Sequence, residues 1–307
     1  MLRCLILPLL LGACASLPEP AQPVAMEAAL APCPPAAGLA MLGDERARGD
    51  AILDMAQADR DRLALALLPC LADPDPALRD GVTYTALSQM MRSALIGAGT
   101  IAPLKTELLV MLAADDPAGF APPFAALALA EVARTDRVSP WMTAEERSAL
   151  IAAAHTYLAS LSDYRGFSDT EGWRHGVAHT ADLLMQLSLN RQLTRPQADA
   201  ILAAVALKAG PADHAYVFGE SERLATPVMY LAQKEMLSEA EWTAWFESLW
   251  PADDPLREDA YSSEAALAKL HNLRAFSQAV YVSAKASNEA TYEAVGRAAF
   301  ALLNSLP

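Results

Sequence analysis

The chain has 307 residues, 53% of them apolar, and its 37 acidic side chains outnumber 23 basic ones to give a net charge of −14. A surface this acidic repels phosphate backbones and anionic lipid headgroups, so we expect no nucleic-acid partner and no peripheral adhesion to an anionic bilayer. The sequence contains no P-loop, GxGxxG, GxSxG or CxxC motif, which leaves the common nucleotide-binding, hydrolase and zinc-ribbon chemistries without support.

The N-terminus has the layout of a signal peptide. Arg3 precedes an apolar run over 5–11 that is far shorter than the roughly 20 residues of a membrane-spanning helix. Leu11-Gly12-Ala13-Cys14 resembles the lipobox of bacterial lipoproteins, which implies removal of residues 1–13 and acylation of Cys14. Ala15, in place of Asp, implies by the same resemblance an outer-membrane lipoprotein that faces the periplasm. The alternative is an ordinary secreted protein with a chance cysteine.

Residues 14–43 are rich in proline and alanine and are predicted to form a tether between the lipid and the domain. Once Cys4 is removed and Cys14 is acylated, Cys33 and Cys70 remain as an even pair in an oxidising compartment. We therefore predict a Cys33–Cys70 disulfide, with two inert thiols as the alternative.

From residue 44 to residue 307 the apolar spacing is that of helices, and no segment alternates with a period of two. We predict an all-α domain of helical hairpins packed in series, either a HEAT-like α-solenoid or, as the alternative, an α/α toroid. Thr143, Thr194 and Ser238 each begin a capping box. Helices are predicted over 44–57, 59–72, 76–95, 101–114, 121–135, 143–161, 172–190, 195–209, 215–236, 239–250, 262–285 and 288–305.

The first unusual stretch runs from Asp163 to Leu184, from a polar loop into a predicted helix. At 100° per residue, His175, His179, Asp182 and Gln186 form one narrow polar stripe on a mostly apolar helix. We interpret it as a stripe that faces a groove, although such residues also serve as an ordinary solvent-exposed side or as core histidines.

Two histidines four residues apart can share a zinc ion. Gly176 occupies the position of the general base in HExxH, however, and Asp182 lies about 10 Å along the helix from His175, so the ligands would be incomplete. We predict no cofactor and leave a metal at His175 and His179 as a minor alternative that needs ligands from Asp169, Glu171, Asp213, His214, Glu220 or Glu222.

The second stretch runs from His214 to Ala225. Glu220 and Arg223 are three residues apart and share one helix face. A local surface ion pair is the simpler interpretation. Alternatively, Arg223 crosses to the first stretch and neutralises Asp182 through its planar guanidinium.

Three segments together resemble the uncharacterised bacterial domain-of-unknown-function family 2785. They are Tyr164-Arg165-Gly166-Phe167, the segment from Gly172-Trp173 to His179-Thr-Ala-Asp182, and Gly219-Glu220-Ser-Glu222-Arg223-Leu224. The resemblance covers about residues 140–285. It implies a helical fold and supports grouping His175, His179, Asp182, Glu220 and Arg223 in one site, with Trp173, Arg165 and Glu222 as secondary members. It implies no reaction.

Two further clusters are interpreted as structural. Trp242, Trp245, Phe246 and Leu249 have the spacing of a core-facing helix seam, with sugar or peptide stacking as the alternative. His271, Asn272 and Arg274 are interpreted as solvated or capping residues, with completion of the groove as the alternative.

Two functions from different classes are consistent with these features. The first is a membrane-anchored envelope lipoprotein whose helical-repeat domain binds or organises an envelope protein or a small ligand without catalysis. The second is an envelope hydrolase in which His175 or His179 is the general base and Asp182 orients it. The extended concave surfaces of helical-repeat folds and the lipid tether favour the first.

Overall fold

The computed structural model describes residues 33–34, 39, 41–258, 260–287 and 289–307. These described residues form one compact unit. Its α-helices are α1 (Glu45–Asp54), α2 (Gln57–Leu67), α3 (Thr85–Arg92), α4 (Ala98–Leu112), α5 (Ala121–Val138), α6 (Ala144–Ser160), α7 (Gly176–Ser188), α8 (Arg195–Ala209), α9 (Glu220–Ala232), α10 (Glu239–Ser248), α11 (Pro255–Glu258), α12 (Glu264–Ser287) and α13 (Glu293–Ser305).

Capping side chains fix where several helices begin. At α6, the Glu146 carboxylate accepts a hydrogen bond from the Thr143 backbone N–H at 2.8 Å, and the Thr143 hydroxyl accepts one from the Glu146 N–H. Ser238 and Glu241 repeat this reciprocal arrangement at α10. These bonds satisfy backbone donors that the first turn of a helix leaves free.

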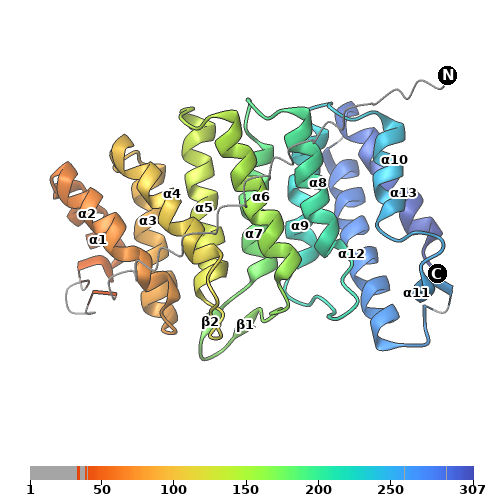
Figure 1. Ribbon diagram of the computed structural model, residues 1–307, viewed down its shortest axis with the longest axis horizontal. Coiled ribbons are helices and arrows are strands. Elements are labelled where there is room, and N and C mark those ends of the chain that lie inside the picture. Colours follow the sequence, from red (N-terminus) through yellow and green to blue (C-terminus); the bar gives the residue numbers. More distant parts are fainter. Residues whose placement is uncertain (1–32, 35–38, 40, 259, 288) are drawn as a thin grey trace, which may run out of the picture. The chain divides into compact units, whose positions relative to one another are not determined.

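Consecutive helices pack as hairpins, and the hairpins pack on one another (Figure 1). Helices α3, α5, α7, α9 and α12 form one row of neighbours, and α2, α4, α6 and α8 form a second. Contacts between α4 and α5, α6 and α7, and α8 and α9 join the two rows. The all-α fold class is therefore confirmed. The HEAT-like solenoid, as opposed to the toroid, remains a prediction.

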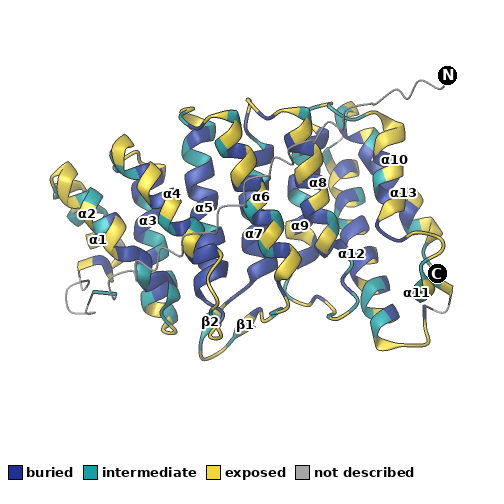
Figure 2. Ribbon diagram, viewed as in Figure 1, coloured by how far each residue is buried: buried dark blue, intermediate teal, exposed yellow. Residues whose placement is uncertain are grey.

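The deepest part of the core lies along α5 and α7, as the burial colours in Figure 2 show. Thirteen of the eighteen residues of α5 and ten of the thirteen residues of α7 are buried. Small alanines let neighbouring helices approach closely. Polar side chains on α7 therefore meet protein atoms on most sides.

Three local departures from the predicted helices are seen. Residues Leu68–Ala72 form a 3₁₀ helix and Ala77–Tyr84 a π-helix, each within a segment predicted as α-helical. A hairpin of β1 (Phe167–Ser168) and β2 (Gly172–Trp173) precedes α7. Within the described part of the chain, these two short strands make the only sheet.

The N-terminal part of the described chain is joined to the helical rows in two ways. Cys33 and Cys70 form a disulfide, with their Cα atoms 4.9 Å apart. Leu39 and Leu42, from the segment expected to be the tether, are buried in the core. Cys14 lies outside the described residues. In the part that the structure describes, none of the helices combines the length and apolar character needed to cross a bilayer.

Candidate functional site: a braced aromatic hairpin

A short antiparallel hairpin positions the first stretch. Phe167 pairs with Trp173, and the backbone N–H groups of Arg174 and His175 continue the pairing by donating to the Gly166 and Arg165 carbonyls. His175 then takes a left-handed backbone conformation, with φ of 57°, and α7 begins at Gly176. The helix predicted from residue 172 therefore begins four residues later, because this segment pairs with the chain before it.

The two histidines are buried. The His175 ring stacks on Trp173, with centroids 4.7 Å apart, and lies 5.8 Å from the His179 ring. The His179 ring packs edge-on against Phe124, and its Nδ1 lies 3.2 Å from the Pro123 carbonyl oxygen. Because a carbonyl oxygen only accepts, Nδ1 is the protonated nitrogen of a neutral His179.

Burial keeps both imidazoles uncharged at neutral pH. It lowers the pKa of His175 to about 4, and the nearby positive charge of Arg223 acts in the same direction. It lowers the pKa of His179 to about 3, and the positive charges of Arg223 and, once protonated, of His175 add to the effect. Each ring can accept a proton or a hydrogen bond, but neither carries charge.

Glu220 joins the second stretch to the first. It is buried in the first turn of α9, directly after Gly219, whose φ of +84° is left-handed. One carboxylate oxygen, Oε2, accepts a hydrogen bond from the Phe218 N–H at 2.9 Å. The other, Oε1, lies 3.8 Å from His175 Nε2, which is buried and has no hydrogen-bond partner among the described residues. Two segments that are distant in sequence thus meet at these side chains.

Asp182 and Arg223 form an ion pair between α7 and α9, with Oδ1 and Nη1 3.1 Å apart. Burial raises the pKa of Asp182 to about 6; Arg223 opposes this shift, and the Glu131 carboxylate adds to it. The Arg223 side chain is 46% exposed, so solvent screens the pair. We therefore expect Arg223→Ala to cost about 1 kcal/mol, less than for a fully buried pair.

The secondary residues have different surroundings. Arg165 forms an ion pair with Asp163 and also donates to the carbonyls of Pro117 and Ala118. Glu222 is exposed on the first turn of α9. Trp173 is exposed on the hairpin while one face of its ring covers His175.

An aromatic cluster, formed by Phe167, Trp173 and Phe218 with the exposed Val217 next to Phe218 in the chain, lies over His175, on which the Trp173 ring stacks. Phe167, Trp173 and Val217 are 45%, 37% and 71% exposed. The Trp173 ring centroid lies 5.0 Å from that of Phe167 and 6.1 Å from that of Phe218. Sequence analysis did not predict this cluster, because its members come from the β1–β2 hairpin and from the loop before α9, which are far apart in the sequence.

Glycine is required beneath this cluster. A Cβ atom at Gly166 would lie 2.1 Å from the Phe218 ring. The loop before β1 therefore approaches the loop before α9 only because this position has no side chain. The glycine within Tyr164-Arg165-Gly166-Phe167 thus has a packing explanation.

Two buried arginines, also not predicted, fix the hairpin from the other side. Arg79 donates to the Glu171 carbonyl at 2.7 Å, and Arg174 donates to the Ala118 carbonyl at 2.8 Å. Both guanidinium groups lie over the Phe120 ring, 4.3 and 4.1 Å from its centroid. Cation–π contacts of this kind are stronger when desolvated, so they hold the hairpin against α5.

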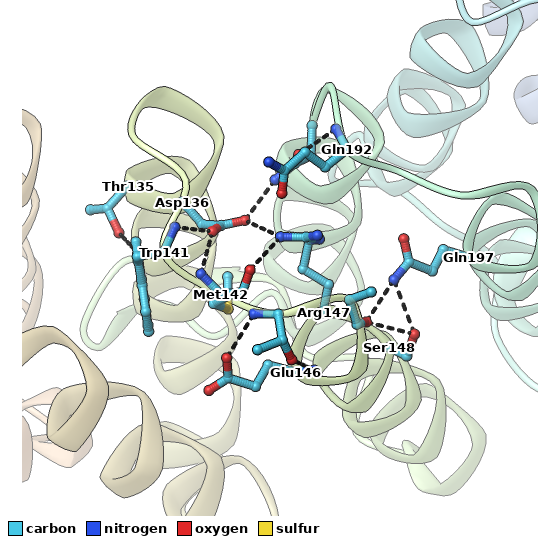
Figure 3. Close-up of polar contacts among 12 residues, drawn as sticks. Thr135, Asp136, Trp141, Met142, Glu146, Arg147, Ser148, Gln192 and Gln197 are labelled. Atoms are coloured by element: carbon cyan, nitrogen blue, oxygen red, sulfur yellow. Dashed lines mark hydrogen bonds and ion pairs between the residues drawn. The ribbon is translucent and has the colours of Figure 1, made fainter.

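A cluster of buried polar residues around Asp136 has a structural role and lies at the C-terminal end of α5 (Figure 3). Buried Asp136 accepts hydrogen bonds from the backbone N–H groups of Trp141 and Met142 and from the side chains of Arg147 and Asn190. Both oxygens are therefore satisfied, as a buried carboxylate requires. This group ties the α5–α6 turn to the end of α7.

The remaining sequence candidates serve packing. Trp242, Phe246, Leu249 and Trp250 are buried. Asn272 accepts from the Tyr216 N–H and donates to the carbonyls of Pro211 and His214, which fixes the loop before α9. Across the described residues, no group of three His, Cys, Asp or Glu side chains is arranged to hold a metal ion.

The fold and the site define a class of protein. It is an all-α domain of packed helical hairpins in which buried polar residues lie beneath an aromatic surface. The chain belongs to the family described as "Protein of unknown function (DUF2785)", whose model matches residues 108–282, more than half of its length. Both stretches fall within that match. No curated protein and no solved structure matches the chain.

Proposed function

We propose that this protein is a lipoprotein of the bacterial cell envelope, anchored through Cys14 to the outer membrane, whose helical domain binds a partner through the aromatic cluster. Helical hairpins in series present extended surfaces for partners, and we infer a HEAT-like solenoid for this domain. The lipobox-like Leu11-Gly12-Ala13-Cys14 supports the anchor.

The observation that carries the binding proposal is the contrast between the aromatic cluster and the residues beneath it. Phe167 and Trp173 on the β1–β2 hairpin and Val217 in the loop before α9 expose large apolar surfaces. His175 and Glu220, directly below, are buried. Exposed aromatic groups on a rigid support are typical of binding hot spots, since little conformational entropy is lost when they are covered.

The alternative, a hydrolase with His175 or His179 as general base, has weaker support. A general base needs access to the substrate and a group that orients it. Both histidines are buried, and Asp182 pairs with Arg223. A cavity of about 550 Å³ near the hairpin is lined by Tyr157, Asp163 and Arg174, and neither histidine contributes to its lining.

The anchor is tested by metabolic labelling with an alkyne-bearing fatty acid. The wild-type chain should incorporate the label and Cys14→Ala should not, because the thiol is the acceptor. Cys4→Ala is the matched control and should label like wild type. Equal labelling of wild type and Cys14→Ala would exclude acylation at this residue.

Binding is tested by replacing Trp173 with a photoreactive amino acid in living cells. Illumination should give a discrete adduct in the envelope fraction. The control is the same replacement at Val282, a 61% exposed apolar residue on α12. An adduct specific to position 173 supports a binding surface, whereas identical patterns at both positions would contradict it.

A further inference from the structure

A second cavity, of about 300 Å³, lies among α3, α4 and the C-terminal end of α5. It shares no lining residue with the aromatic cluster, and it lies at the end of α5 opposite Pro123 and Phe124, which contact His179. Its volume is at the lower end of the range of roughly 300–1,000 Å³ for small-ligand pockets. The size suits a ligand smaller than a typical drug molecule.

The wall of this cavity is mostly apolar. Its large apolar lining residues are Met91, Ile96, Ile101, Val138 and Trp141. Trp141 is held in place, because its indole N–H donates to the Thr135 hydroxyl at 3.0 Å and its backbone N–H donates to Asp136. The wall is thus supported by the same Asp136 group that ties the α5–α6 turn (Figure 3).

The charged groups on the lining are both cationic. Arg92 and Arg134 line the cavity, and the lining contains no carboxylate, although the chain carries a net charge of −14. Arg92 is already bound through two guanidinium nitrogens to Glu131. Arg134 forms no hydrogen bond or ion pair with any residue that the structure describes. Its guanidinium is therefore available to an anion.

We propose that this cavity binds a small anionic amphiphile, a carboxylate with a short alkyl chain. The carboxylate would pair with the planar guanidinium of Arg134, which offers two parallel donors. The alkyl chain would lie against Met91, Ile96 and Trp141 and leave water. The proposal is independent of the function proposed for the aromatic cluster.

The test uses Trp141 as the reporter. The full-length chain is reconstituted in phosphatidylcholine vesicles and titrated with octanoate brominated at its terminal carbon. Bromine quenches nearby indole fluorescence, so wild type should lose the emission of Trp141 in a saturable way. Trp141→Phe should lack this saturable quenching, and the quenching that remains in this variant is subtracted as the contribution of the other four tryptophans.

Arg134→Gln should weaken saturable binding at least about ten-fold, because a charge-assisted pair is removed. Arg191→Gln, at an exposed arginine in the α7–α8 loop, is the matched control and should bind like wild type. Unbrominated octanoate should compete, while octanol and octylamine should compete poorly. Equal competition by octanol, an unchanged affinity in Arg134→Gln, or quenching that is the same in wild type and Trp141→Phe would each overturn the proposal.

Discussion

At the residue scale, the two histidines behave as interior groups whose charge would be costly. Their pKa values in the fold, about 4 for His175 and about 3 for His179, lie below the value of 6.5 for a free imidazole. Between pH 6.5 and the lowered pKa of each histidine, the unfolded chain binds more protons than the folded chain, so folding stability falls as the pH falls. Asp182 acts in the opposite sense, since its raised pKa of about 6 gives stability at low pH that is lost as the pH rises.

We therefore expect the free energy of unfolding to decrease from about pH 6.5 to pH 4, by roughly 1–3 kcal/mol for each histidine, partly offset by Asp182. In the double variant His175→Gln/His179→Gln, the free energy of unfolding, measured by denaturant titration at each pH, should change less steeply with pH over this range. A double variant with the wild-type slope would show that these imidazoles do not titrate as described.

At the element scale, α7 and α9 begin in the same unusual way. Each is preceded by a residue with left-handed backbone, His175 before α7 and Gly219 before α9. This turn brings the first residues of both helices to the aromatic cluster. At Gly219 a side chain would be strained, because an L-residue in this conformation costs about 1–2 kcal/mol.

Gly219→Ala should accordingly lower the stability by about 1 kcal/mol and Gly99→Ala should raise it by about 0.5–1 kcal/mol. Gly99 lies in α4, where an added Cβ meets no atom within 4 Å and the helix favours alanine. Thermal melts of both variants check the pair. The same sign of change in the two would contradict the assignment of a strained turn at Gly219.

Local sequence signals predicted some elements well and others poorly. The helix predicted over 195–209 has those bounds in the structure, because Thr194, Pro196 and Gln197 mark its start. The helix predicted from residue 172 does not begin there, because Trp173 pairs with Phe167 in a hairpin. Neither the apolar periodicity nor the helix-capping residues of the sequence indicate this pairing. Helix predictions based on periodicity therefore fail where short-range backbone pairing competes.

The same limit applies to the site. The five grouped residues lie on or next to α7 and α9, as their shared stripe and motif suggested, and Arg223 lies within 3.1 Å of Asp182. Their burial could not be predicted, since it depends on α5 covering α7. The Asp136 group was missed because its partner Asn190 is 54 residues away in sequence.

At the scale of the whole molecule, the N-terminal segment is joined covalently to the helical rows. The Cys33–Cys70 disulfide closes a loop with a sequence separation of 37, for which chain entropy gives a stabilisation of about 4 kcal/mol at most. Leu39 and Leu42, within this loop, are buried in the core and hold that part of the chain independently of the bond. The actual gain should therefore be smaller.

Reducing agent should lower the Tm of the wild-type protein and leave that of Cys33→Ser unchanged. Cys33 is the position to replace, because Cys70 is fully buried and its loss would also disturb the core. A wild-type Tm that does not respond to reduction would show that the bond contributes nothing to stability.

The central claim is that the two stretches, separated in sequence, form one binding surface. A photoreactive amino acid at Val217, in the loop before α9, tests it most directly, because Val217 is exposed beside Phe218 and the latter contacts Trp173. We predict that this position gives an adduct with the same partner as position 173, and that Trp173→Ala removes the adduct while the Tm stays near wild type. A different partner at position 217, or an adduct that persists in Trp173→Ala, would contradict the account.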